Sequence, residues 1–210
     1  MFSLETSGSM TNTKEKRPYH HGDLRQAVIE TAMEMLGEGG GSEFTLRQIA
    51  RRAGVSHAAP YKHFPDKAAL LADIALIGFD RLREALVGAQ AKAGGDLPNA
   101  FFAASQAYIE FGRQNPDLYR LMFGGEIGKV SNVHLDGRAL GAFEVVTDLL
   151  ERGQAAGFIR KRPIRGQAAA CWAQLHGITM LMLDGLLIPE KVGNGAIEAA
   201  LETLQEGLSA

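Results

Sequence analysis

The sequence predicts an all-α protein, and two observations lead to that fold class. Apolar residues recur every three or four positions along most of the chain and almost nowhere alternate as they do in strands. The apolar runs are bounded by Gly, Pro or Asn, which commonly end helices and begin loops. The chain has 210 residues, of which 46% are hydrophobic, so it can bury a sizeable core. We therefore expect about nine helices packed around apolar interiors.

The N-terminal third carries the clearest start and stop signals for helices. A first helix is expected from Asp23 to Leu36, where a glycine cluster follows. Thr45 is placed to cap a second, short helix, because Gln48 stands three residues later as in a capping box. Gly54 can adopt the left-handed backbone conformation with which such a helix commonly ends.

A third short helix is expected over residues 57–64, after a tight turn, with Ser56 or His57 as its N-cap. Two short helices joined by a turn that contains glycine have the sequence form of a helix-turn-helix. Between residues 44 and 65 the chain holds two histidines, no acidic residue and four basic residues, namely Arg47, Arg51, Arg52 and Lys62. This charge pattern suits a phosphate backbone, although charges at helical spacing are also typical of a solvated face.

The second helix of a helix-turn-helix presents its N-terminal residues to base edges in the major groove of DNA. His57, Ala58 and Ala59 occupy those positions here. Histidine can hydrogen-bond a base edge or a phosphate, whereas alanine can contact only apolar groups such as a thymine methyl. A second basic group precedes the first helix and consists of Lys14, Lys16, Arg17, His20, His21 and Arg25.

The remaining chain continues as helices. Pro65 should end the third helix, and Asp66 can cap a fourth that continues to Gly94. Further helices are expected at about residues 97–114, 116–123, 136–154, 164–187 and 195–208. The apolar stretch 168–188 is long enough to cross a bilayer, but it contains four polar residues, among them His176 and Asp184. We therefore expect a buried helix at an internal or subunit interface and no membrane partner.

Part of the N-terminal third resembles the DNA-binding domain of the TetR (tetracycline-repressor) family. The resemblance rests on four segments in the order and spacing of that domain: Thr45-Leu46-Arg47-Gln48-Ile49-Ala50, Gly54-Val55-Ser56, Tyr61-Lys62-His63-Phe64 and Asp66-Lys67. It implies phosphate contacts by Thr45, Tyr61 and Lys67, with Val55, Pro60 and Phe64 packed inside. Together with the basic patch, the expected DNA-contacting residues are Thr45, Arg47, Ser56, His57, Ala58, Ala59, Tyr61, Lys62, His63 and Lys67.

The second half resembles a C-terminal ligand domain of the same family that is marked by a Trp/His-Gly segment. The matching segments are residues 115–124 and Trp172-Ala173-Gln174-Leu175-His176-Gly177. The expected organisation is a flexible N-terminal leader or arm at 1–19, a helix-turn-helix domain at 20–66 and a helical ligand-binding and dimerisation domain at 67–210.

The resemblance also implies a twofold homodimer whose last two helices from each chain form a four-helix bundle. Two reading helices would then lie about one DNA turn apart, roughly 34–36 Å, and suit a palindromic operator in double-stranded DNA. The residues expected at the dimer interface are Leu175, Leu183, Leu186, Ile197, Leu201, Leu204 and Leu208.

Aromatic and methionine side chains are plentiful in the middle of the chain. Most should be ordinary core, yet a bundle cavity lined by such side chains with a few polar groups is what an apolar ligand requires. We expect an unidentified, largely apolar small-molecule effector, with His176 either in its pocket or serving as a hydrogen-bonded core histidine. The candidate lining residues are Phe101, Tyr108, Phe111, Met122, Phe143, Trp172, His176 and Met180.

No metal, cofactor or catalytic site is predicted. His57 and His63 lie six apart and do not share a helix face, and no Cys or carboxylate cluster completes a metal site. Residues 124–130 lack the spacing of a phosphate-binding loop and are expected to be a linker. Cys171 lies in an apolar helix, which favours an inert buried thiol.

The sequence thus predicts a cytoplasmic DNA-binding transcriptional regulator, with no enzymatic activity and no cofactor. The single cysteine favours a reducing compartment, and residues 1–10 lack the features of a signal peptide. The expected mode of action is that of a homodimeric repressor released from its operator by a small molecule. The alternatives are an all-helical small-molecule enzyme or carrier with an incidental helix-turn-helix-like segment, and an interaction module that uses the dimer helices alone.

Overall fold

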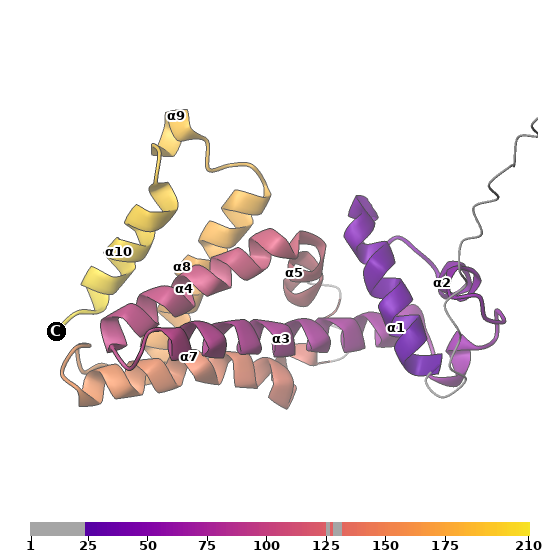
Figure 1. Ribbon diagram of the computed structural model, residues 1–210, viewed down its shortest axis with the longest axis horizontal. Helices are drawn as coiled ribbons and strands as arrows, with labels where there is room; N and C mark the ends of the chain where they lie inside the picture. Colours follow the sequence, from indigo (N-terminus) through magenta and orange to yellow (C-terminus); the bar gives the residue numbers. More distant parts are fainter. Residues whose placement is uncertain (1–23, 125–126, 128–131) are drawn as a thin grey trace, which may run out of the picture.

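The computed structural model describes residues 24–124, 127 and 132–210. Within these residues the chain is helical, and the extended pairing is a single bridge between Ile159 and Ser209, so the expected all-α class is confirmed. The helices are α1 Leu24–Met35, α2 Leu46–Arg52, α3 Lys67–Lys92, α4 Leu97–Gln114, α5 Pro116–Phe123, α7 Gly137–Ala155, α8 Ile164–Leu183, α9 Pro189–Val192 and α10 Ala196–Leu208 (Figure 1). The basic residues expected at 14–21 and most of the expected linker at 124–130 lie outside the described residues.

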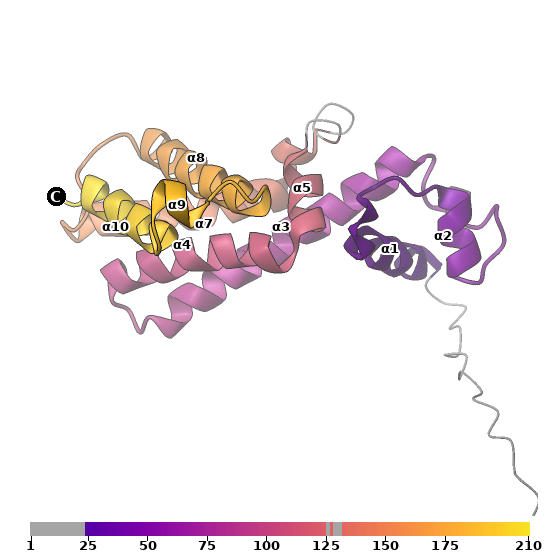
Figure 2. The same cartoon turned by 90° about the horizontal axis from the view of Figure 1, so that it is seen from above.

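Helix α3 extends through both parts of an elongated molecule. Figure 1 places α1 and α2 at one end, around the start of α3, and the remaining helices along its length, and Figure 2 shows the same division from above. The Asp66 carboxylate caps α3 by accepting from the Ala69 N–H at 2.8 Å. Leu70 and Ile74 are buried near α1, whereas Phe79 and Leu82 are buried farther along, among α4, α5 and α7.

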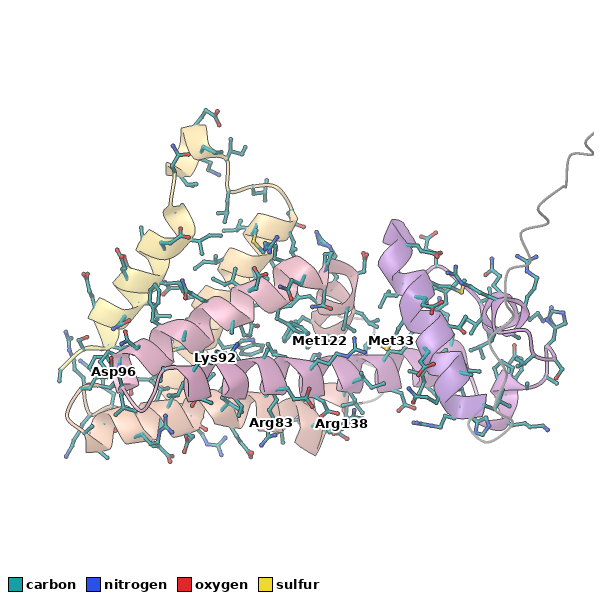
Figure 3. The ribbon with its side chains drawn as sticks, viewed as in Figure 1. Met33, Arg83, Lys92, Asp96, Met122 and Arg138 are labelled. Carbon is teal, nitrogen blue, oxygen red and sulfur yellow. The ribbon has the colours of Figure 1, made fainter. Side chains whose placement is uncertain are left out.

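Two further contacts hold α5 and α7 against α3. Gly78 of α3 makes room for α5, because a Cβ there would lie 2.5 Å from the Met122 Sδ. Arg138 at the start of α7, which is labelled in Figure 3, donates from Nε to the Asp80 carboxylate at 2.7 Å. Helix α5 also packs against Leu36–Gly40, the π-helical turn that follows α1. The helices around residues 24–40 therefore meet the rest of the chain through both α3 and α5.

The expected third helix over residues 57–64 is wrong. The segment forms a turn and then the 3₁₀ helix Pro60–Lys62, with the Ala59 N–H donating to the Ser56 carbonyl at 2.9 Å. Proline has no N–H to donate to the carbonyl four residues earlier, and its ring crowds that carbonyl. Pro60 therefore prevents a continuous α-helix over this segment, and tighter turns form instead.

The apolar stripe of α10 faces the interior of its own chain. Leu201, Leu204 and Leu208 are buried where α10 packs on α4 and α8. Leu175 of α8 is buried as well. Their assignment to a dimer interface is wrong, because each amphipathic helix buries its apolar face within its own subunit.

The other residues expected at a dimer interface differ in exposure. Leu183 and Ile197 are partly buried against the same core, while Leu186 is exposed. Helix α8 ends at Leu183, earlier than expected, and is followed by Gly185 with φ +67°. No helix in the described ranges combines the length and apolar character needed to cross a bilayer.

Close packing of α4 on α8 generates a stability prediction. A Cβ at Gly112 would overlap the methyl group of Thr179, which is fully buried and bonded through Oγ1 to the Leu175 carbonyl. Gly112→Ala should therefore lower the free energy of unfolding by about 1–3 kcal/mol in urea denaturation. Gly88→Ala is the matched control, because its Cβ would meet no atom within 4 Å and helical alanine is favoured by up to about 1 kcal/mol. Equal effects of the two substitutions would contradict the proposed close contact.

Candidate functional site

The N-terminal scaffold is fixed by the capping box that the sequence predicts. Gln48 N–H donates to Thr45 Oγ1 at 3.2 Å, and Thr45 N–H donates to Gln48 Oε1 at 2.7 Å. The neighbouring Phe44 and Ile49 are both buried, as expected of a hydrophobic staple. This arrangement fixes the start of α2 relative to the turn that precedes it.

Most of the expected DNA-contacting side chains project outward from this scaffold. Tyr61 is 51% exposed, and the other exposed members are Thr45, Arg47, Ser56, His57, Ala58, Lys62 and His63. Pro60 and Phe64 are buried as expected, and Val55 is half-buried. Ala59 is only 7% exposed, so its expected base contact is wrong: the methyl group packs inward beside Pro60.

The basic residues of this region divide into paired and unpaired cations. Arg52 donates from both guanidinium ends to the Glu38 carboxylate, at 2.7 and 2.5 Å, and this ion pair lowers the pKa of Glu38. Arg25 is paired with Asp73. Arg47, Arg51 and Lys62 form no ion pair with any residue that the structure describes, so their charge is available to an external anion.

Lys67 has a structural partner that the sequence did not suggest. Its Nζ donates to the Ser42 carbonyl at 2.6 Å and lies 5.9 Å from the centre of the Phe44 ring. Lys67 therefore ties the first turn of α3 to the loop before α2. An ammonium group has three donors, so a phosphate contact by Lys67 stays a prediction.

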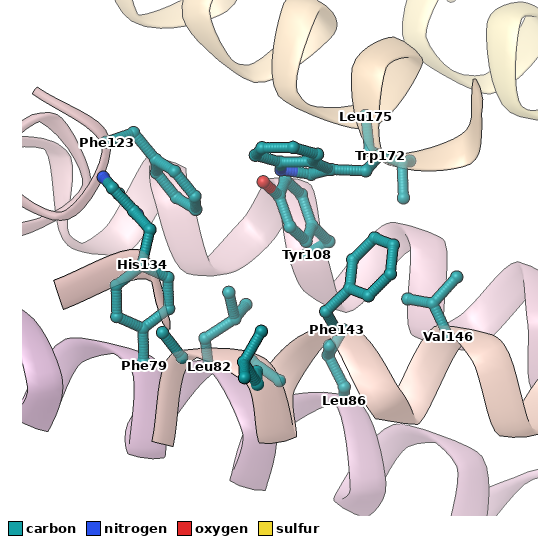
Figure 4. A pocket seen from close by; sticks show the side chains of 13 residues that line it. Phe79, Leu82, Leu86, Tyr108, Phe123, His134, Phe143, Val146, Trp172 and Leu175 are labelled. Carbon is teal, nitrogen blue, oxygen red and sulfur yellow. The ribbon is translucent and has the colours of Figure 1, made fainter. Parts of the chain in front are cut away.

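A cavity of about 240 Å³ lies in the larger part of the molecule, between α3, α4, α5, α7 and α8 (Figure 4). Rings from four elements surround it: Phe79 and Phe123 pack edge to face with centroids 5.4 Å apart, and Phe143 and Trp172 do so at 6.3 Å. Its lining residues are Phe79, Leu82, Leu86, Tyr108, Phe123, His134, Ala139, Leu140, Ala142, Phe143, Val146, Trp172 and Leu175.

The structure brings together three of the eight residues expected to line a pocket: Tyr108, Phe143 and Trp172. Phe101 lines a smaller neighbouring cavity. Phe111, Met122, His176 and Met180 line neither of these two cavities, so a ligand contact by them stays a prediction. Periodicity finds apolar faces but cannot distinguish a face that lines a void from one that fills the core, so most of the α3 and α7 lining was missed.

His176 belongs to a buried chain of polar side chains. Tyr119 Oη lies 2.7 Å from His176 Nδ1 and 3.0 Å from Tyr108 Oη. Figure 4 shows the indole nitrogen of Trp172 beside the Tyr108 hydroxyl. This three-residue chain, Tyr108–Tyr119–His176, is called the polar relay below. The alternative in which His176 is a hydrogen-bonded core histidine is therefore the one that the structure supports.

Burial sets the charge state of the polar relay. It raises the pKa of Tyr119 to about 12 and that of Tyr108 further, so both hydroxyls keep their protons. Burial lowers the pKa of His176 below its ordinary value of 6.5, which favours the neutral imidazole. The relay is thus a neutral hydrogen-bonded chain. Burial also raises the pKa of the Cys171 thiol to about 11, consistent with an inert core cysteine.

Comparison with known proteins gives matches over both parts of the chain. Residues 28–74 match the family described as bacterial regulatory proteins, tetR family, and residues 101–204 match the tetracyclin repressor-like C-terminal domain. A solved structure from Rhodococcus sp. RHA1, titled as a protein with unknown function, is similar over 93% of this chain and 100% of its own, with 35% identity and a TM-score of 0.79.

Two curated relatives match shorter stretches of this chain. The class C tetracycline repressor protein of Escherichia coli is 49% identical over 47 residues, or 22% of each chain. The HTH-type transcriptional regulator AcrR of Shigella flexneri is 34% identical over 74 residues, which are 35% of this chain and 34% of that protein. The alignments thus span about a fifth and about a third of these two relatives.

The lowered pKa of His176 predicts a pH-dependent stability. Near pH 6.5 the unfolded chain takes up a proton at this histidine while the folded chain does not, so the free energy of unfolding should fall as the pH drops from about 7 to about 5. Gln cannot titrate, so the free energy of unfolding of His176→Gln should fall less over this range. The difference between the two slopes against pH should correspond to less than one proton taken up per chain on unfolding. Denaturant unfolding across this pH range measures the difference, and parallel curves for the two proteins would contradict it.

Proposed function

The chain belongs to the tetR family of bacterial regulatory proteins, and from this premise we propose that it is a homodimeric repressor that leaves its operator when a small molecule fills the cavity. Members of this family are DNA-binding transcriptional regulators rather than enzymes. The alternative of a small-molecule enzyme or carrier is not favoured. A DNA partner also places the protein in the cytoplasm.

One observation carries the DNA-binding proposal: the segment after α2 exposes polar and cationic side chains on a rigid base. Ala59, Pro60 and Phe64 anchor the segment, and His57, Tyr61 and Lys62 point outward from it. Cations without internal partners can neutralise phosphates and release counterions, whereas His57 and Ala58 stand where base edges would be met. The proposed DNA-contacting set is Thr45, Arg47, Ser56, His57, Ala58, Tyr61, Lys62, His63 and Lys67.

The outer face of α8 supports the homodimer. This helix packs on α4, α7 and α10, yet the residues of its outer face are also small or apolar from Gly166 to Leu181. A helix that is apolar all round is normally covered on both sides. The exposed or half-buried residues of this face are Gly166, Ala169, Ala170, Ala173, Gly177 and Leu181. A second copy seated here would bring two reading segments to a palindromic operator.

The cavity is placed to influence the DNA-binding part through two helices. Phe79 and Leu82 of α3 line it, and the first turn of α3 is bonded to the α2 loop through Lys67. Phe123 of α5 lines it too, and α5 packs against the turn after α1. A molecule that binds one arrangement of these helices better would shift the spacing of the reading segments. Couplings of about 1–3 kcal/mol give a 5–150-fold loss of DNA affinity.

Lys62 tests the DNA interface. Using a duplex selected from a random pool, Lys62→Ala should weaken binding and reduce the slope of log affinity against log salt by about two per dimer, as expected for one lost phosphate contact in each subunit. Lys92→Ala removes the same charge at the far end of α3 and should leave both quantities unchanged. Fluorescence anisotropy at several salt concentrations measures them. Identical slopes for the two variants would overturn the proposed interface.

Ala173 tests the dimer. Ala173→Glu places a charge in the middle of the outer face of α8, so light scattering should report a monomer with weakened operator binding. Ala91→Glu introduces the same side chain on the exposed surface of α3 and should remain dimeric. A dimeric Ala173→Glu protein would exclude this face from the interface.

A further inference from the structure

Within the proposed function, on which this inference rests, we infer that the cavity binds an alkyl-substituted aromatic molecule in one direction. The aromatic ring lies toward the mouth of the cavity, and the alkyl chain points inward to a second, smaller void. The arrangement of the two spaces, the aromatic lining of the larger one and the apolar lining of the smaller one lead to this class of ligand.

The larger cavity is open on one side. Three of its thirteen lining residues are exposed, namely His134, Leu140 and Trp172, whereas Leu86 is buried and Val146 half-buried. Figure 4 shows Leu86 and Val146 on the other side of the cavity from His134. A ligand therefore enters past the exposed residues, and its leading end moves toward Leu86 and Val146.

A second void, of about 20 Å³, adjoins the larger cavity and is called the inner void below. Four residues line both spaces: Leu86, Tyr108, Val146 and Leu175. Three of these are aliphatic side chains with alternative rotamers, so a small rotation can join the inner void to the larger cavity. A space of this volume holds about one water-sized group, such as the methyl group that ends an alkyl chain.

The inner void suits an apolar group. Its remaining lining residues are Phe101, Ala104, Ser105, Val145, Leu149 and Cys171. Ser105 Oγ already donates to the Phe101 carbonyl at 2.9 Å, and no buried side-chain N or O atom in the described ranges lacks a partner. A polar group carried into this space would be desolvated without compensation. The inward end of the ligand is therefore a hydrocarbon chain.

The larger cavity favours an aromatic ring. Within the Phe79–Phe123 and Phe143–Trp172 pairs the ring planes meet at 83° and 80°. Such pairs present both ring faces and ring edges, and a further ring can pack edge to face or offset against them. A dry cavity of about 150 Å³ accommodates benzene, so 240 Å³ corresponds to about ten non-hydrogen atoms, or one ring with about four further carbons.

The lining also excludes charge from the buried part of the ligand. None of the residues that line either space is Asp, Glu, Lys or Arg. An ionised group would therefore be desolvated without a partner, which is strongly unfavourable. A polar substituent is compatible only at the mouth, where solvent reaches it.

Trp172 reports on occupancy, because it lines the larger cavity and is the only tryptophan of the chain. Tryptophan fluorescence of the purified full chain, titrated without DNA, gives dissociation constants for propylbenzene and pentylbenzene. Burial of two further methylene groups should tighten the binding of pentylbenzene about fifteenfold relative to propylbenzene. A ratio near one would overturn the inward chain.

Three variants locate the chain. Ala104 lines only the inner void, so Ala104→Val should lower this ratio to about fourfold or less, while propylbenzene binds within about twofold of wild type. Val145→Ala enlarges the inner void and should raise the ratio. Ala139 lines only the larger cavity, so Ala139→Val, the matched control, should weaken both probes and leave the ratio unchanged. Equal ratios in Ala104→Val and Ala139→Val would overturn the assignment of the chain to the inner void.

The direction of the ligand is measured on the wild-type protein, without any substitution in the core. In NMR spectra of the pentylbenzene complex, nuclear Overhauser effects should connect the terminal methyl group to Ala104 and Leu149, and the ring protons to Phe143 and Trp172. Ring protons beside Ala104, or the terminal methyl group beside Trp172, would overturn the direction.

The outcome is separable from that of the proposed function. Probe binding is measured without DNA, and DNA affinity is measured without probe. Absence of alkylbenzene binding in a protein that binds its selected duplex overturns only the ligand class. Alkylbenzene binding by a protein that fails to bind DNA overturns only the regulator.

Discussion

Continuity of α3 is the constraint on which the rest of the molecule depends. Its 26 residues form an unbroken helix whose first turns belong to the DNA-binding part and whose later turns line the cavity. A helix resists bending unless a Pro, a glycine pair or an inserted group interrupts its hydrogen bonds, and α3 has no Pro. Displacement of its cavity-lining turns therefore moves its N-terminus as well. The bond from Lys67 to Ser42 carries that movement into the loop before α2.

The polar relay is the second organising feature, because it places three polar groups where water is largely excluded. Each such group would be costly if it lacked a partner, yet no buried side-chain N or O atom in the described part of the chain does so. The relay joins α4, α5 and α8 by hydrogen bonds whose geometry is directional. Apolar packing alone would let these helices slide, and the relay instead fixes their register beside the cavity.

Local signals were predictable from the sequence, whereas partners in space were not. The capping box at Thr45 and Gln48 depends on residues three apart, and the structure contains it as expected. The helix expected over residues 57–64 was wrong because the missing N–H of Pro60 outweighed the N-cap signal of Ser56 or His57. The leucine stripe of α10 was recognised, but its periodicity did not reveal whether the partner was the same chain or a second one.

The candidate site divides in the same way. Surface positions such as Tyr61 and Lys62 follow from the spacing of a helix-turn-helix, since exposure there is set by a few neighbouring residues. The cavity, by contrast, is a space that side chains leave unfilled between helices far apart in the sequence. Leu82 and Leu86 carry the same helical signal whether they face a void or a filled core. Ion pairs such as Arg52 with Glu38 likewise join separate elements, and no local pattern identified them.

An open cavity in a chain of this size has an energetic consequence of its own. At about 24 cal/mol per Å³, a closed void of 240 Å³ would cost on the order of 6 kcal/mol, comparable with the whole stability of a typical domain. Entry of solvent at the mouth, beside the exposed His134, reduces that figure. An occupant recovers part of the lost packing energy, and it does so by contacting α3 and α5 directly. The energy that stabilises the filled state is therefore available at the two helices that also position the DNA-binding segment.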